Sequence, residues 1–111
     1  MSGQTKRLGD VDPVTLRRWL DEGRAVLIDV REEPEYAAER IPEATLIPLS
    51  TFADHIPAAE GPEKTVVFHC RTGNRTGKAA ELLCRSGFDE VFHLAGGIEA
   101  WRQAGYRTIK S

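Results

Sequence analysis

Short apolar runs separated by polar segments recur along the whole chain. Two of them, residues 25–30 and 65–70, are nearly continuous, which is typical of strands buried on both faces of a sheet. A third run covers residues 91–94, and a shorter one at 45–47 ends before Pro48. The pattern therefore predicts strands at these four places.

Helix signals lie between the predicted strands. Asp12 followed by Pro13 is typical of a helix start, and Gly23 stands where a C-terminal glycine belongs. Because strands alternate with helices, we expect an α/β fold with a mainly parallel sheet. The further helices expected are residues 33–39, a short one capped by Ser50 and reaching Ile56, one from the turn at 71–74 to Ser86, and 98–104.

Length and composition limit what this fold can be. The 111 residues give room for one domain, which we place at residues 9–111 after a polar tail at 1–8. The net charge is −2 with Lys and Arg spread along the chain, so nucleic acid is not an expected partner. No apolar run approaches the roughly 18–20 residues that span a bilayer, and the N-terminus lacks the apolar core of a secretory signal. We expect a cytoplasmic location and no membrane contact.

The candidate chemistry lies at Cys70, which ends a predicted strand and precedes a glycine-containing turn. Ligand sites in open α/β sheets lie beyond the carboxyl ends of the strands. The turn at residues 70–76 would direct backbone N–H groups and a helix N-terminus at the sulfur, which lowers a thiol pKa and favours the thiolate. Gly73 can adopt a positive φ and curl the backbone around the sulfur. We therefore expect a nucleophilic cysteine.

Two arginines lie within this turn. The guanidinium groups of Arg71 and Arg75 suit oxyanions, so the turn is built for a nucleophilic sulfur that attacks an anion. No separate base is required if the turn itself stabilises the thiolate.

Three segments together resemble one known family. The sequence Cys-Arg-Thr-Gly-Asn-Arg at 70–75 resembles the active-site loop of the rhodanese family, which in thiosulfate-using members reads cysteine, arginine, any residue, glycine, any residue, then arginine or threonine. Residues 28–32 with Tyr36 and residues 40–44 resemble the family's first conserved segment, and residues 94–101 resemble its last one. The resemblance extends from about residue 9 to 107 and departs at 40–44, Arg-Ile-Pro-Glu-Ala, where the family often reads His-Ile-Pro-Gly-Ala.

The resemblance implies a fold and a reaction. The fold is rhodanese-like, with a central, mainly parallel five-stranded sheet and helices on both faces. In the reaction, the Cys70 thiolate takes the outer sulfur of thiosulfate or a persulfide donor, releases sulfite in the case of thiosulfate, and passes the sulfur to cyanide, a thiol or a dithiol protein. No metal or organic cofactor is expected, and a monomer is the default state.

The resemblance also implies roles for individual residues. Cys70 is the catalytic residue, and Asp29 and Arg31 are candidates for supporting its loop. The backbone amides of the loop would hold the persulfide sulfur, and Arg71 and Arg75 would orient the donor's sulfonate. The implied substrate-binding residues are Arg71, Thr72, Gly73, Asn74, Arg75 and Thr76.

Structural interpretations remain beside these roles. Cys70 is open to the interpretation of a buried core residue, and Asp29 and Arg31 to that of a structural ion pair. Cys84 lies about 13 Å along the following helix, too far from the loop for a disulfide and in a position typical of the core. The spacings of the histidines match no zinc pattern.

Three other functions compete with thiosulfate sulfur transfer. A phosphatase or arsenate reductase has one residue more between cysteine and arginine than the four here, and the shorter loop suits a sulfur atom better than a phosphate. A binding module that has lost turnover commonly lacks the loop cysteine. A persulfide carrier in a protein-to-protein relay would use the same loop with a cysteine desulfurase as donor.

Overall fold

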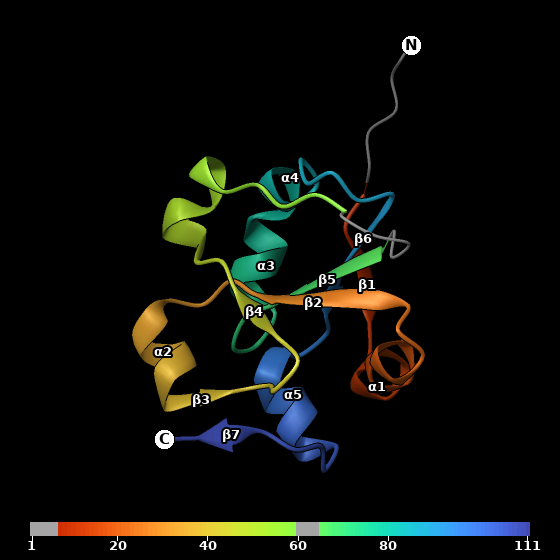
Figure 1. Ribbon diagram of the computed structural model, residues 1–111, viewed down its shortest axis with the longest axis vertical. Helices are drawn as coiled ribbons and strands as arrows, with labels where there is room; N and C mark the ends of the chain where they lie inside the picture. The colour runs from red at the N-terminus through yellow and green to blue at the C-terminus, as the bar shows by residue number, and fades with distance from the viewer. Residues whose placement is uncertain (1–6, 60–64) are drawn as a thin grey trace.

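A parallel sheet forms the centre of the computed structural model, which describes residues 7–59 and 65–111. Within these residues the sheet has five strands, and every neighbouring pair is parallel, so the predicted α/β class and mainly parallel sheet are confirmed (Figure 1). Most of the expected N-terminal tail, residues 1–6, lies outside the described residues. The strand order is β1 (Gly9–Val11), β6 (Glu90–Leu94), β5 (Thr65–His69), β2 (Ala25–Asp29) and β4 (Thr45–Leu46).

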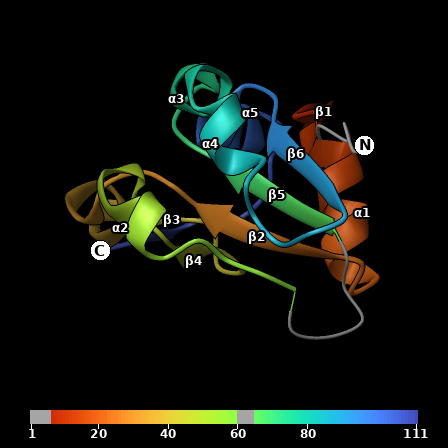
Figure 2. The same ribbon diagram turned by 90° about the horizontal axis from the view of Figure 1, so that it is seen from above.

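Helices cover both faces of the sheet, as expected. In Figure 1, α1 (Pro13–Asp21) and α5 (Gly97–Gln103) lie below the central strands, whereas α3 (Asn74–Lys78) and α4 (Ala80–Leu83) lie above them. The 3-10 helix η1 (Leu49–Asp54) covers the same face as α3 and α4. Viewed from above, α3 and α4 lie together beside the arrowheads of β5 and β6 (Figure 2).

A smaller unit borders the face that α1 and α5 cover. Here α2 (Glu33–Ala38) leads into β3 (Glu39–Arg40), which pairs in antiparallel fashion with β7 (Ile109–Lys110) near the C-terminus. The C-terminal segment thus returns to the chain that follows β2 (Figure 1).

Alternation along the central strands produces two apolar cores. On β2, Leu27 points into the core between the sheet and the helices α1 and α5. Its neighbour Ile28 points into the core between the sheet and the helices α4 and η1. Trp101 on α5 and Phe52 on η1 are fully buried, one in each core. Burial of both faces explains why the sequences of β2 and β5 are nearly continuous apolar runs.

The start of α1 confirms the expected cap. The Asp12 side chain accepts a hydrogen bond from the Thr15 backbone N–H at 2.8 Å, and Pro13 occupies the first helical position. Gly23 follows the helix with a φ of +66°. Local sequence chemistry therefore determines both ends of this helix.

Two predicted helices were wrong in detail. The helix after the cysteine loop does not run unbroken to Ser86, because Ala79 leaves the helical region (ψ 15°) between α3 and α4. Gly77, two residues earlier, weakens the helix there. Ser50 does not cap a helix that reaches Ile56: η1 starts at Leu49 after Pro48, and the Ser50 hydroxyl instead donates to Glu32 at 2.7 Å.

Three short strands were not predicted: β1, β3 and β7. Each has only two or three residues, too few for an alternating pattern to be seen. In the part of the chain that the structure describes, no helix has the length and apolar character to cross a membrane.

Candidate active site

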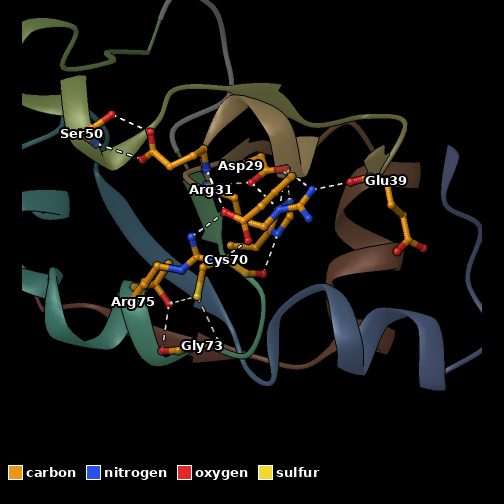
Figure 3. A network of polar contacts seen from close by, with 11 residues as sticks. Asp29, Arg31, Glu39, Ser50, Cys70, Gly73 and Arg75 are labelled. Carbon is orange, nitrogen blue, oxygen red and sulfur yellow. Dashed lines mark hydrogen bonds and ion pairs between the residues drawn. The ribbon is translucent and has the colours of Figure 1, made fainter. Parts of the chain in front are cut away.

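Cys70 follows the last residue of β5, at the carboxyl edge of the sheet, and is only 1% exposed. Gly73 turns the chain back with a φ of +95°, a conformation that favours glycine, and its backbone N–H donates to Cys70 Sγ at 3.1 Å (Figure 3). The expectation that Gly73 has a positive φ and curls the loop around the sulfur is confirmed.

The surroundings of the sulfur lower its pKa. Burial acts in the opposite direction and raises it, but the backbone N–H and hydroxyl of Thr76 and the backbone N–H groups of Gly73 and Thr72 together outweigh burial. These groups stabilise the thiolate because each places a positive hydrogen atom near the sulfur. The loop therefore provides thiolate stabilisation mostly through backbone donors, as the sequence led us to expect.

The start of α5 fixes this loop from below. The backbone N–H of Ile98 donates to the Cys70 carbonyl oxygen at 3.0 Å, and that of Glu99 donates to the Arg71 carbonyl oxygen at 3.2 Å. A Cβ on Gly97 would overlap the Arg71 carbonyl oxygen and lie 2.6 Å from that of Cys70. The Gly96–Gly97 pair thus lets α5 approach the loop closely.

Both loop arginines already have carboxylate partners. Arg75 makes a two-pronged ion pair with Glu35 on α2, with both N–O distances at 2.8 Å. The Arg75 partner lowers the pKa of Glu35 to about 2. Arg71 is 67% exposed and donates through Nε to Glu99 at 2.9 Å. A donor anion would therefore have to share these guanidinium groups with carboxylates, which the sequence did not reveal.

Asp29 and Arg31 form a buried pair on the other face of the sheet from the Cys70 side chain. Asp29 accepts from the Arg31 side chain at 2.8 and 3.0 Å and also from its backbone N–H at 2.9 Å, and Arg31 Nη2 donates to the Glu39 carbonyl oxygen at 2.6 Å (Figure 3). Among the described hydrogen bonds, none joins either residue to Cys70. Their geometry is that of an ion pair at a strand end, one of the two interpretations that the sequence allowed.

His69 connects this pair to the loop. It lies beside Asp29 in the β2–β5 register, and its Nδ1 donates to the Cys70 carbonyl oxygen at 3.1 Å. Burial lowers the pKa of His69, which favours the neutral ring, and its Nε2 lies 3.5 Å from Asp29 Oδ2. Among the described residues, that nitrogen has no hydrogen-bond partner.

The remaining loop residues differ in exposure. Thr72 and Asn74 are exposed, with Asn74 as the first residue of α3, whereas Thr76 is fully buried. The Thr76 hydroxyl lies 3.7 Å from Cys70 Sγ. The structure therefore brings Thr76 to the sulfur through its side chain as well as its backbone.

Two residues at the site were missed by sequence reasoning. His93 Nδ1 lies 2.6 Å from the Thr76 hydroxyl oxygen, and Asp10 lies beyond His93. The signal for His93 was a polar ring inside an apolar strand. Asp10 gave no signal, because β1 is too short to be recognised.

Cys84 directly follows α4 as its C-cap residue and is partly buried against the core that this helix covers. The structure contains no disulfide between the two cysteines. Among residues 7–59 and 65–111, no cluster of three or more histidine, cysteine or acidic side chains is arranged to hold a metal.

Comparison with known proteins agrees with this architecture. The model of the rhodanese-like domain family matches residues 12–104. The chain belongs to this family. Its five-stranded parallel sheet, covered by helices on both faces, is accordingly a rhodanese fold.

Individual relatives support the assignment. An uncharacterized protein of Synechocystis is 38% identical over all of this chain, which spans 62% of that relative's length. Thiosulfate sulfurtransferase GlpE of Pseudomonas fluorescens is 40% identical over 83% of this chain and 84% of its own. The crystal structure of a rhodanese-related protein from Thermoplasma volcanium aligns with a TM-score of 0.76 and 27% identity, covering 91% of this chain and 97% of that one.

Proposed function

We propose that this rhodanese-like domain is a sulfurtransferase that carries sulfur as a persulfide on Cys70. The thiolate attacks the outer sulfur of thiosulfate, the bond between the two donor sulfurs breaks, and sulfite leaves with the electron pair of that bond. An acceptor then attacks the outer sulfur of the persulfide, and Cys70 departs again as a thiolate. Each step is a nucleophilic displacement at the outer sulfur. The nucleophile bonds to that sulfur with its own electron pair, and the leaving group departs with the electron pair of the bond that breaks.

The observation that carries this proposal is the set of donors around Cys70 Sγ. The Gly73 N–H contact of 3.1 Å and the lowered pKa favour the thiolate, the form that attacks a sulfur donor. The same donors would stabilise the negative charge of the persulfide.

The donor is proposed to be a small anionic sulfur compound such as thiosulfate. A relative with 40% identity is named a thiosulfate sulfurtransferase. Arg75 lies beside the loop, and its two contacts with Glu35 leave other N–H groups of the guanidinium for a sulfonate. Arg71 is the more exposed of the two and would meet the donor first.

Intact mass tests the proposal. Incubation with thiosulfate should add the mass of one sulfur atom, and cyanide should then remove it. The Cys70→Ser variant should gain nothing, while Cys84→Ser, which changes the other cysteine, should load like the original protein. Loading that survives in Cys70→Ser would refute the assignment.

A second mass measurement separates two kinds of donor. If thiosulfate adds no mass, a cysteine desulfurase with cysteine is the next donor to try, since a protein-to-protein relay uses the same loop. Loading by the desulfurase alone would replace the small-molecule donor with a protein, and loading by neither would remove Cys70 as a sulfur carrier.

A further inference from the structure

A chain of polar contacts leads from the buried sulfur to the surface. Cys70 Sγ lies 3.7 Å from the Thr76 hydroxyl oxygen, which lies 2.6 Å from His93 Nδ1. On the other side of the ring, His93 Nε2 lies 2.6 Å from an Asp10 carboxylate oxygen. Three separate segments of the sequence, β1, the loop with α3, and β6, therefore meet in one line.

Strand register holds this line in place. β1 pairs in parallel with β6, and Asp10 lies directly opposite His93. His93 lies two residues after Val91 on β6, so the two side chains point to the same face of the sheet. Val91 lies in the core that α4 covers, and the His93 ring therefore points to the face that α3 and α4 cover. Thr76 is on α3 and fully buried.

The direction of the hydrogen bonds follows from the groups. A carboxylate only accepts, so His93 Nε2 carries a proton and donates it to Asp10. In a neutral ring Nδ1 is then an acceptor, and the Thr76 hydroxyl donates to it. The Thr76 oxygen keeps its lone pairs for the thiol proton of Cys70. The Gly73 carbonyl oxygen also lies near this hydroxyl, but at 3.1 Å, farther than His93.

The two ends of the line differ in solvent access. Cys70 is 1% exposed, whereas the Asp10 side chain is 76% exposed and that of His93 14%. A buried thiol needs a path for its proton each time it becomes a thiolate. The hydrogen-bonded line supplies such a path to the surface.

We propose that Asp10, His93 and Thr76 form a proton relay for Cys70, in which His93 is a positioning residue that acts on the sulfur through the Thr76 hydroxyl. The proposal rests on the proposed function, because the relay is the route by which the Cys70 thiol loses its proton and becomes the thiolate that carries sulfur. It parallels the arrangement of an acid, a histidine and a nucleophile, with a hydroxyl inserted between histidine and sulfur.

The proton transfer balances without any further reactant. The S–H bond of Cys70 breaks, its electron pair stays on sulfur, and the proton moves to the Thr76 oxygen while the Thr76 proton moves to His93 Nδ1. The products are a thiolate and an imidazolium held by Asp10. The total charge is unchanged, and every hydrogen bond of the line has a donor in both states.

The charges that face His93 come from its neighbouring strand and, through Thr76, from the loop. Asp10 on β1 contacts the ring directly, and Cys70 after β5 lies behind the Thr76 hydroxyl. From the α3 side, Thr76 and the Gly73 backbone face the ring, and neither is charged. Changing Asp10 or His93 therefore alters the charge that the sulfur experiences without removing a loop amide.

A pH titration of the Cys70 thiolate tests the relay. Thiolate formation is followed by ultraviolet absorbance, with Cys70→Ser subtracted as the background. In His93→Gln we expect the midpoint to rise by about one pH unit or more, because the sulfur loses a neighbouring cation. Asp10→Asn should raise it by less. An unchanged midpoint in folded His93→Gln overturns the relay.

Matched variants separate the relay from general damage. His55→Gln changes an exposed histidine at the end of η1 and should leave the midpoint where it was. Thr76→Ser keeps the hydroxyl and should keep the midpoint, whereas Thr76→Val should raise it. Equal shifts in the His55 and His93 variants would contradict the proposal. If His93→Gln does not fold, Asp10→Asn, altered at an exposed side chain, decides the question.

This titration does not depend on sulfur transfer. If His93→Gln titrates like the original protein while thiosulfate still loads Cys70, the relay is wrong and the proposed function stands. If thiosulfate and a desulfurase both fail to load the original protein, the proposed function is wrong, and the titration still shows whether His93 controls the thiol.

Discussion

Two polar clusters lie at the same edge of the sheet, on its opposite faces, and they differ in how their polar groups are paired. In the first, Asp29, Arg31 and His69, which we call the ion-pair cluster, the buried carboxylate has a buried guanidinium as its partner. In the second, Cys70 with the donors of its loop, which we call the sulfur cluster, the buried sulfur meets backbone N–H groups and a hydroxyl.

The difference shows how one edge can serve structure and chemistry together. A buried charge that is already paired with a full opposite charge gains little further stabilisation from a bound ligand. The direct contacts of the sulfur are backbone N–H groups and a hydroxyl, so no permanent ion pair has to be broken for a ligand to approach it. We therefore propose that the ion-pair cluster supports the fold and that the sulfur cluster is the reactive site.

The largest expected effect comes from breaking the ion-pair cluster. Asp29→Ala leaves the buried Arg31 without its carboxylate, which should lower the free energy of unfolding by about 3–5 kcal/mol in urea denaturation. Asp21→Ala removes the 64% exposed partner of Arg17 and should cost less than about 1 kcal/mol. Equal losses in the two variants would mean that burial of the Asp29–Arg31 pair adds nothing.

The second effect tests how closely α5 must approach the sulfur cluster. Gly97→Ala places a methyl group against the Cys70 and Arg71 carbonyl oxygens at a φ of +61°. Gly23→Ala has nearly the same φ, +66°, with open space around the new carbon. The Gly23 variant should lose about 1–2 kcal/mol of stability with normal sulfur loading. The Gly97 variant should lose more and load more slowly, and normal loading there would show that the contact is dispensable.

Only some of the structural features behind these predictions could be predicted from the sequence. The strands 25–29 and 65–69 were predicted because both of their faces are buried, and α1 because Asp12, Pro13 and Gly23 give local signals. The break at Ala79 and the strand β1 depend on contacts with distant segments, which no local pattern contains.

Likewise, only the part of the candidate site that lies within one loop could be predicted from the sequence. Cys70 and Gly73 lie in one loop, so their relation could be inferred from the sequence alone. The partners of Arg75 and His93 could not, because Glu35 and Asp10 are brought to them by the fold from 40 and 83 residues away. Long-range pairs of this kind decide whether a loop arginine is an unpaired cation.

The third effect concerns the arginines of the sulfur cluster. Arg75→Ala should weaken thiosulfate use by about 1.5–3 kcal/mol, the worth of a charged hydrogen bond, measured as a rise in KM during steady-state turnover. Arg71→Ala should do less, since that side chain is 67% exposed. Glu35→Gln removes the competing carboxylate and should lower KM. A rise in KM in both Arg75→Ala and Glu35→Gln would instead mean that Arg75 keeps α2 in position and does not bind thiosulfate.

The smallest effect is an acid dependence of stability. The pKa of Glu35 is lowered to about 2 in the folded protein from an ordinary value of 4.5. Its ion pair therefore stabilises the fold above about pH 4.5, and this contribution is lost as the pH falls through about 2. The difference in unfolding free energy between the original protein and Glu35→Gln should shrink over that range. A difference that stays constant with pH would contradict the assignment of the shift to Arg75.

The most direct test of the sulfur cluster follows the transferred atom itself. Thiosulfate labelled in its outer sulfur is mixed with the protein, and the chain is digested and mapped by mass spectrometry before and after cyanide is added. The label should appear on the peptide that contains Cys70 and then in thiocyanate. Label found on the Cys84 peptide, or thiocyanate formed while Cys70 never carries the label, would contradict a Cys70 persulfide.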